Sequence, residues 1–190
     1  LREATKLGGK NSATAFPSSF KEEDREISSK EEVANGFNHF FATVGSKLAE
    51  GITPTDVKAE DLVRKSTKIF KFQEICKESI IVYAAKLKNK RSAGWDGLSS
   101  YVLKQIVQAL IDPLAHLFNL SLRTGYIPPE FKVSRIILLF KDGKKDVFGN
   151  YRPISLLPTF SKLFECIVND QIRNYFNCFQ LLSGCQFGFR

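Results

Sequence analysis

The chain has 190 residues, and its 28 lysines and arginines exceed its 20 acids to give a net charge of +8 at pH 7. A basic balance of this size favours a polyanionic partner, nucleic acid before a membrane surface. Seventeen phenylalanines argue against disorder over most of the length, and the absence of a signal peptide or a membrane-spanning apolar run argues against a secreted or membrane protein.

Cysteine usage and the missing methionine set two further expectations. The four cysteines form no C-x-x-C pair and only two histidines accompany them, so we expect free thiols in a reducing interior and no structural zinc site. Because a translated chain normally begins with methionine and none occurs here, we expect Leu1 to be an internal position of a longer chain.

The first half of the chain is predicted to be helical. Residues 1–28 are rich in glycine, serine and charge without an apolar period, and are expected to form a flexible linker. The sequence SKEE at 29–32 is a capping-box pattern that predicts a helix start, and Gly51 suits the end of that helix. The apolar residues between them recur at helical spacing and should face a core, namely Val33, Phe37, Phe40, Phe41, Val44 and Leu48.

Further helices are predicted before residue 130. One covers roughly residues 73–88 and runs into a basic run and the loop SAGWDGLSS. Ser99 or Ser100 can cap the next helix. Asp112-Pro113 places a cap and a first-turn proline ahead of another helix, which should end at Gly125 and the following IPPEF.

The character of the sequence changes after residue 132. The segment VSRIILLF (133–140) is β-branched and apolar, and predicts a buried strand that ends at the turn KDGKK. YRPISLL (151–157) predicts a second extended segment, because Pro153 keeps the preceding residue out of helical geometry. From Phe160 the apolar residues return to helical spacing. We therefore predict an α+β fold, with a mainly helical N-terminal half followed by a small antiparallel sheet and a long amphipathic helix.

The strand at 133–140, the turn KDGKK and the extended segment at 151–157 would form a hairpin, and two cations are expected at its tip. The ammonium of Lys141 and the planar guanidinium of Arg152 suit phosphate oxygens, since the guanidinium fork binds bidentately and the lysine neutralises charge. Pro153 lowers the entropy lost in holding the arginine forward. The alternative is an exposed hairpin whose charges are only solvated.

Two basic runs flank the same apolar region. The run 86–91 carries four cations and no acid, and residues 132–152 carry another net +4. Each run alone is most simply a solvated face, but together they favour a shared phosphate-facing surface.

These residues resemble a known family. The segment FKVSRIILLFKDGKKDVFGNYRPISLLPTFSKLFECIVNDQI (131–172) looks like the start of the reverse transcriptase domain of non-LTR (LINE-type) retrotransposons. Upstream, KNKRSAGWDGLSSYVLKQI (88–106) resembles the segment before the fingers of those enzymes, and LLSGCQFGFR (181–190) resembles the next block. VANGFNHFFATVG (33–45) resembles the helix between endonuclease and polymerase regions. The three blocks in 88–190 are correctly ordered and spaced.

The resemblance implies a role for each matching residue. Lys141 and Arg152 match the fingers positions that contact the triphosphate of the incoming nucleotide, dNTP. The block that grips the template strand matches Gln186, Phe187, Gly188 and Arg190. Candidate contacts to a nucleic-acid backbone are Lys88, Lys90, Arg91, Lys144 and Lys145. Asp96 lies in the matching upstream loop, and we interpret it as a loop or cap carboxylate.

The resemblance also bears on catalysis. In this family two metal ions, held by clustered carboxylates of the palm, carry nucleotidyl transfer. Those blocks follow the Q-F-G-F block, whereas this chain ends at Arg190. We therefore expect no catalytic and no metal-binding residue, predict this chain alone to be inactive, and expect Mg²⁺ to be required only by the full-length parent. The acidic run at 22–26 is interpreted as solvated.

The implied architecture is an incomplete right-hand polymerase. Residues 1–28 are the linker, 29–90 a helical region preceding the polymerase, and 91–190 a fingers segment truncated before the palm carboxylates. Its partners would be an RNA template, a DNA primer, dNTP and the remaining palm and thumb, in nucleus or cytoplasm. Two alternatives stay open: a non-catalytic basic RNA-binding module derived from such an element, and a translated fragment without function.

Overall fold

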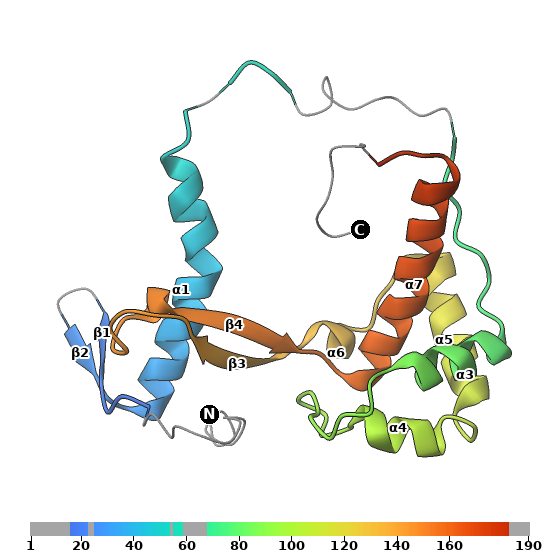
Figure 1. The fold of residues 1–190 in the computed structure, drawn as a ribbon, viewed down its shortest axis with the longest axis horizontal. Coiled ribbons are helices and arrows are strands. Elements are labelled where there is room, and N and C mark those ends of the chain that lie inside the picture. Colours follow the sequence, from blue (N-terminus) through green and yellow to red (C-terminus); the bar gives the residue numbers. More distant parts are fainter. Residues whose placement is uncertain (1–15, 23–24, 54, 59–67, 183–190) are drawn as a thin grey trace. The chain divides into compact units, whose positions relative to one another are not determined.

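The computed structural model of the protein describes residues 16–22, 25–53, 55–58 and 68–182. These residues form six α-helices, a 3₁₀-helix and two small antiparallel sheets, which confirms the mixed α+β class (Figure 1). They group into two compact units. The hairpin unit holds the described residues up to 58 together with Ile136–Ser155, and the helical unit holds residues 68–135 and 156–182.

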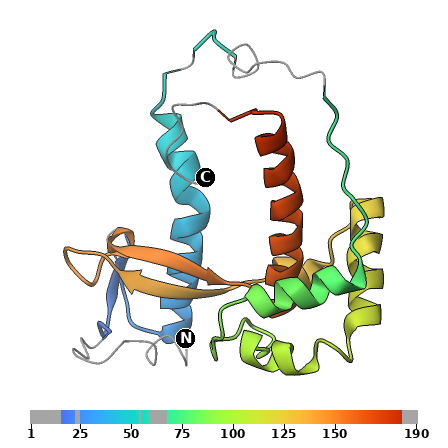
Figure 2. The ribbon, with the colours of Figure 1, turned by 45° about the vertical axis from the view of Figure 1, so that its right-hand side comes forward.

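The hairpin unit combines one long helix with two strand pairs. Its elements, with the strands given at full length, are β1 (Phe20–Glu22), β2 (Arg25–Ile27), α1 (Lys30–Glu50), β3 (Arg135–Phe140), η1 (Phe148–Asn150) and β4 (Tyr151–Leu156). The predicted start of α1 is confirmed, because Ser29 is its N-cap and accepts a hydrogen bond from the Glu32 amide at 3.3 Å. β1 pairs antiparallel with β2, β3 pairs with β4, and η1 contacts α1 (Figure 2).

Aromatic rings form the core of the hairpin unit. Its buried members are Phe20, Ile27, Val33, Phe37, Phe148 and Tyr151. The rings of Phe37 and Phe148 meet edge to face with centroids 4.6 Å apart, and Phe20 stacks on Phe148 at 5.3 Å. Aromatic pairs at such distances stabilise a core beyond the area they bury. The predicted core-facing stripe of α1 was wrong towards its C-terminal end, where Leu48 is 70% exposed.

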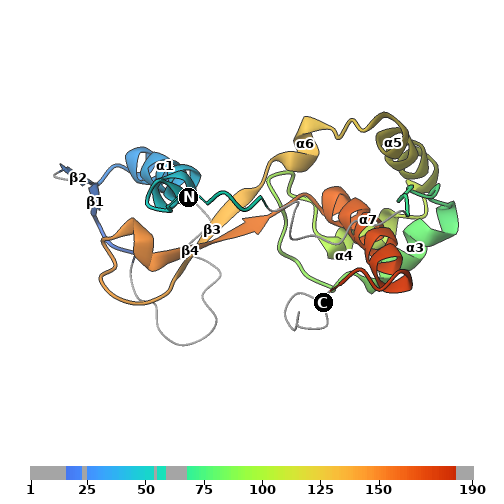
Figure 3. The ribbon, with the colours of Figure 1, turned by 90° about the horizontal axis from the view of Figure 1, so that it is seen from above.

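The helical unit packs five helices around an aliphatic core. They are α3 (Lys77–Lys86), α4 (Ser100–Ile106), α5 (Ile111–Thr124), α6 (Pro129–Lys132) and α7 (Thr159–Cys178). α3 packs against α4, α5 and α7, and α6 contacts α7 (Figure 3). Phe118 of α5 and Leu163 of α7 are both fully buried in this core.

Several predicted details of the helices and strands can be compared with the structure. Ser99 caps α4 through the Val102 amide, and Gly125 ends α5 with a left-handed φ of 70°, both as predicted. Asp112 was wrongly predicted to be a cap: α5 begins at Ile111, two residues before the predicted start, so Asp112 lies inside its first turn. β3 is not the buried strand that was predicted, since none of its residues is buried in this two-stranded sheet.

The first strand pair was not predicted. Phe20 and Ile27 lie opposite each other in the β1–β2 ladder and are both buried, within a stretch that was expected to be linker. The proposed division into regions 1–28, 29–90 and 91–190 stays a prediction. Among the described helices, none combines the length and the apolar character needed to span a membrane.

Candidate nucleic-acid interface

The two cations singled out by the sequence lie on one face of the β3–β4 hairpin. The Lys141 amide donates to the Asn150 carbonyl at 2.8 Å, which closes the hairpin beyond β3. The ring centroids of Phe140 and Tyr151 are 5.4 Å apart, so these two side chains share a face of the hairpin. Because successive strand residues point to opposite faces, Lys141 and Arg152 lie together on the other one.

Both cations are accessible. Arg152 is exposed, and the side chain of Lys141 is 51% exposed. The Lys141 ammonium lies 3.9 Å from the carboxylate of Asp142, which is itself 70% exposed. An exposed ion pair at that separation contributes little stability, so a phosphate could replace the carboxylate at small cost.

Side chains of the hairpin hold the turn between the two cations. The Asn150 amide donates to the Lys144 carbonyl at 2.8 Å, and the Tyr151 hydroxyl donates to the Lys145 carbonyl at the same distance. Gly143 adopts a φ of 81° that only glycine takes readily. The turn is therefore positioned by three separate local constraints.

The lysines within the turn differ in their surroundings. Lys144 is exposed. Lys145 is half-buried, and its ammonium lies 5.8 Å from the centre of the Phe140 ring, on the core-facing side of the hairpin. Of the two, Lys144 is therefore the more accessible candidate for a nucleic-acid contact.

The Tyr151 phenol predicts a pH-dependent stability for the hairpin unit. Burial raises its pKa, and the nearby Asp146 carboxylate adds to the shift. The stability contributed by the neutral phenol is therefore complete below its unfolded pKa of about 10 and is lost as the pH rises through the higher folded pKa. We therefore expect the thermal unfolding midpoint, measured by circular dichroism, to fall further between about pH 9 and about pH 11.5 in the wild type than in Tyr151→Phe. Equal losses would contradict this.

The upstream cations lie in the helical unit, in the loop between α3 and α4. Lys88, Lys90 and Arg91 are all exposed. The Ser100 hydroxyl holds this loop by donating to the Lys88 carbonyl at 2.7 Å. The Arg91 guanidinium lies 6.0 Å from the ring centre of Tyr101.

The remaining predicted site residues have mixed outcomes. Asp96 accepts a hydrogen bond from the Leu98 amide at 3.2 Å, so its reading as a loop carboxylate is confirmed. The predicted template-binding residues Gln186, Phe187, Gly188 and Arg190 lie outside the described residues. Within the part that is described, no group of three or more His, Cys, Asp or Glu side chains could hold a metal ion.

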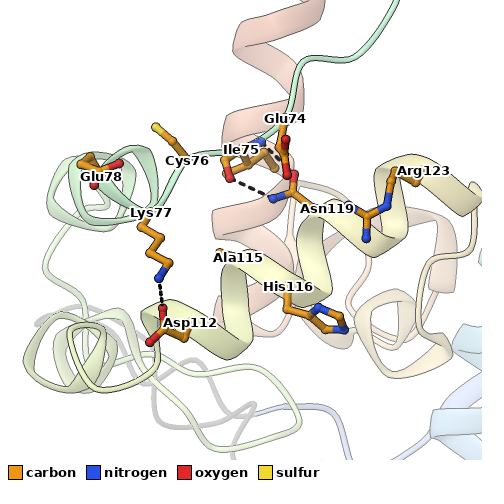
Figure 4. A pocket seen from close by; sticks show the side chains of 10 residues that line it. All are labelled: Glu74, Ile75, Cys76, Lys77, Glu78, Asp112, Ala115, His116, Asn119 and Arg123. Atoms are coloured by element: carbon orange, nitrogen blue, oxygen red, sulfur yellow. Dashed lines mark hydrogen bonds and ion pairs between the residues drawn. The ribbon is translucent and has the colours of Figure 1, made fainter.

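Sequence reasoning missed a cavity of about 700 Å³ between the start of α3 and α5 (Figure 4). An ion pair of Lys77 with Asp112, 2.5 Å apart, lies beside it, and the Asp112 carboxylate raises the pKa of Lys77. Both groups are well exposed, and the lining mixes acids, bases and the imidazole of His116. Such a mixed lining favours no single ligand charge. In the sequence this pair is only a lysine and an aspartate 35 positions apart. Such combinations are too common to indicate a site.

The chain was compared with known proteins. No protein-family model matches it. A 115 kDa protein in the type-1 retrotransposable element R1DM of Drosophila melanogaster is 35% identical over 147 residues, which cover 75% of this chain and 13% of that relative. The RNA-directed DNA polymerase from mobile element jockey of the same species is 29% identical over 154 residues, or 76% of this chain and 17% of the relative. That from Drosophila funebris is 32% identical over 114 residues, or 60% and 12%.

The chain thus spans less than a fifth of the length of these relatives. The predicted resemblance is confirmed, because homologues at 29–35% identity are RNA-directed DNA polymerases of non-LTR retrotransposons. The assignment of this segment to the fingers stays a prediction.

Proposed function

Since its homologues are RNA-directed DNA polymerases of non-LTR retrotransposons, we propose that this chain is a segment of such a polymerase and contacts the incoming nucleotide and the template. The observation that carries the proposal is the placement of Lys141 and Arg152 on one accessible face of a constrained hairpin. The relatives are several times longer, so the activity of the whole enzyme is part of the proposal.

The chemistry of the pair suits a triphosphate. The guanidinium of Arg152 can bind two phosphate oxygens at once, and the ammonium of Lys141 adds a point charge. Because Asn150 and Tyr151 hold the turn, little backbone entropy would be lost when a nucleotide binds. These side chains would bind and orient the phosphates.

The same face carries exposed apolar side chains. Leu139 is 51% exposed and Ile154 is 43% exposed, and each lies two residues from one of the two cations. Side chains two residues apart in a strand share a face. A face that is both cationic and apolar is suited to a nucleotide or to further polymerase chain, which supports a role in binding over a merely solvated hairpin.

The proposal includes further contacts and partners. Lys144 and Lys145 would contact nucleic-acid backbone, as would Lys88, Lys90 and Arg91, and residues 186–190 would contact the template. The partners would be an RNA template, a DNA primer, dNTP, and the palm and thumb of the polymerase. The full-length parent would require Mg²⁺, which activates the primer hydroxyl and holds pyrophosphate in such reactions. The described residues offer it no carboxylate cluster, so no step on this chain is assigned to it.

The test is dNTP binding by the double variant Lys141→Gln, Arg152→Gln. Each lost charge-assisted contact should cost about 1.5–3 kcal/mol, so the affinity for a fluorescent dATP analogue should fall at least tenfold. The matched control is Lys47→Gln, Arg173→Gln, which removes the same charge at two exposed helical positions. Both proteins should keep the unfolding midpoint of the wild type, because all four side chains are exposed.

Equal affinities in the two double variants would contradict the proposal. If the chain also bound single-stranded RNA with a steep salt dependence while dNTP binding was absent, the alternative of a non-catalytic RNA-binding module would be favoured. The net charge of +8, spread over basic runs in both units, is the observation behind that alternative.

A further inference from the structure

A small pocket of the helical unit is lined by lysines and hydroxyl groups. Its volume is about 190 Å³ and its lining residues are Leu87, Lys88, Lys90, Ser92, Ser100, Thr159 and Lys162. Three of the seven are cations, three carry hydroxyls, and none is acidic. Lys162 comes from α7, 72 positions after Lys90 in the sequence, so the fold has brought a third cation to two that the sequence already suggested.

The walls of this pocket are fixed by hydrogen bonds. The Ser100 hydroxyl hydrogen-bonds to the Lys88 and Lys90 carbonyls at 2.7 and 3.2 Å. These bonds fix the backbone from which both lysine side chains extend. The Thr159 hydroxyl donates to the Leu98 carbonyl at 2.6 Å, which ties the first turn of α7 to the same loop. The pocket is therefore a built feature of the unit and not a chance gap between side chains.

We propose that this pocket binds a backbone phosphate of a single-stranded nucleic acid. Three lysines line one cavity and no acidic residue does, so the net charge of the lining favours an anion. A liquid water molecule occupies about 30 Å³, so the pocket has room for a phosphate with some of its hydration. Glu165 lies one turn beyond Lys162 and interacts with its charge, but it does not line the pocket.

An exposed aromatic beside the pocket favours a nucleic-acid strand over free phosphate. Tyr101 follows Ser100 and is 43% exposed, and its amide donates to the Lys90 carbonyl at 3.3 Å. Exposed aromatic rings next to phosphate-binding cations are the combination with which proteins hold single strands, because bases stack on the rings. This inference rests on the backbone contacts proposed above for Lys88 and Lys90, and adds to them Lys162 and a defined phosphate pocket in the helical unit.

The experiment compares two single variants of α7 in the full chain. Lys162→Gln removes a pocket cation, and the matched control Arg173→Gln removes a cation of the same helix that does not line the pocket. With a fluorescein-labelled oligouridylate as probe, Lys162→Gln should lose about tenfold in affinity. It should also lower the slope of log affinity against log salt concentration by about 0.7, the value for one released counterion on a single strand.

Four further outcomes decide the proposal. Lys88→Gln, at an exposed loop position where folding is not at risk, must lower oligouridylate affinity in the same direction. Equal affinities of Lys162→Gln and Arg173→Gln for oligouridylate would overturn the proposal. Binding of inorganic phosphate without any binding of oligouridylate would also overturn it. Adding Lys162→Gln to the Lys141→Gln, Arg152→Gln protein must lower its oligouridylate affinity as much as it does in the wild type. A failure of the dNTP proposal therefore leaves this test intact.

Discussion

Replacing Phe148 by alanine should destabilise the hairpin unit by about 3–5 kcal/mol. The residue is only 6% exposed, and its ring packs against those of Phe20 and Phe37, with centroid distances of 5.3 and 4.6 Å. Removing it leaves a cavity where the turn of the β3–β4 hairpin meets α1. The same change should weaken dNTP binding, because the turn that carries Lys141 and Arg152 loses its anchor.

The measurement has to report on each unit separately. The chain has a single tryptophan, Trp95, which lies in the helical unit, so its fluorescence follows that unit. Hydrogen exchange of the α1 amides follows the hairpin unit. Phe148→Ala should lower the protection of α1 and leave the tryptophan transition in place. The control is Phe140→Ala, because that ring is 36% exposed and should cost only about 1 kcal/mol.

A coupling to Gly36 makes this prediction sharper. A methyl group at position 36 would lie 2.6 Å from the tip of the Phe148 ring, closer than carbon atoms approach. Gly36→Ala should therefore be destabilising in the wild type and much less so in Phe148→Ala, where the space is open. Additive costs, or equal α1 protection in Phe148→Ala and Phe140→Ala, would contradict the assigned packing.

Several helix and strand ends that are set by nearby residues in the sequence were predicted correctly. The Ser29 cap, the left-handed Gly125 and the change to β-branched residues after 132 each act within a few positions of the chain. The site cations Lys141 and Arg152 were found in the same way, because turn and proline chemistry place them at the ends of two adjacent strands. Homology then supported the family on which their roles depend.

Other features depend on contacts between distant segments. β1 and β2 have three residues each, too few for a visible period. Phe20 is buried by rings that include Phe148, 128 positions away. Nothing in the local sequence distinguishes Lys162 from other helix lysines, and only the loop folded against the start of α7 makes it part of a pocket. Sequence patterns hold no information on such pairings without the fold.

Asn119 is the second site where one substitution should have a large effect. Its buried side chain accepts from the Ile75 amide at 2.8 Å and donates to the Ile75 carbonyl at 2.9 Å (Figure 4). Ile75 belongs to no helix or sheet, and the Asn119 side-chain amide satisfies its backbone N–H and C=O as a neighbouring strand would. Asn119→Ala leaves two backbone groups without a partner and should cost about 2–4 kcal/mol. Asn169→Ala, exposed on α7, should stay within about 0.5 kcal/mol of wild type.

The variant Asn119→Asp separates this hydrogen-bond role from mere packing. A carboxylate can accept from the Ile75 amide but can donate to the carbonyl only when protonated, so its folded pKa should lie above the unfolded value. The stability of Asn119→Asp should then be greatest at low pH and fall as the pH rises through the folded pKa, relative to wild type. Urea unfolding followed by Trp95 fluorescence measures this difference. A constant difference between Asn119→Asp and wild type from about pH 4 to pH 8 would show that the side chain only fills space.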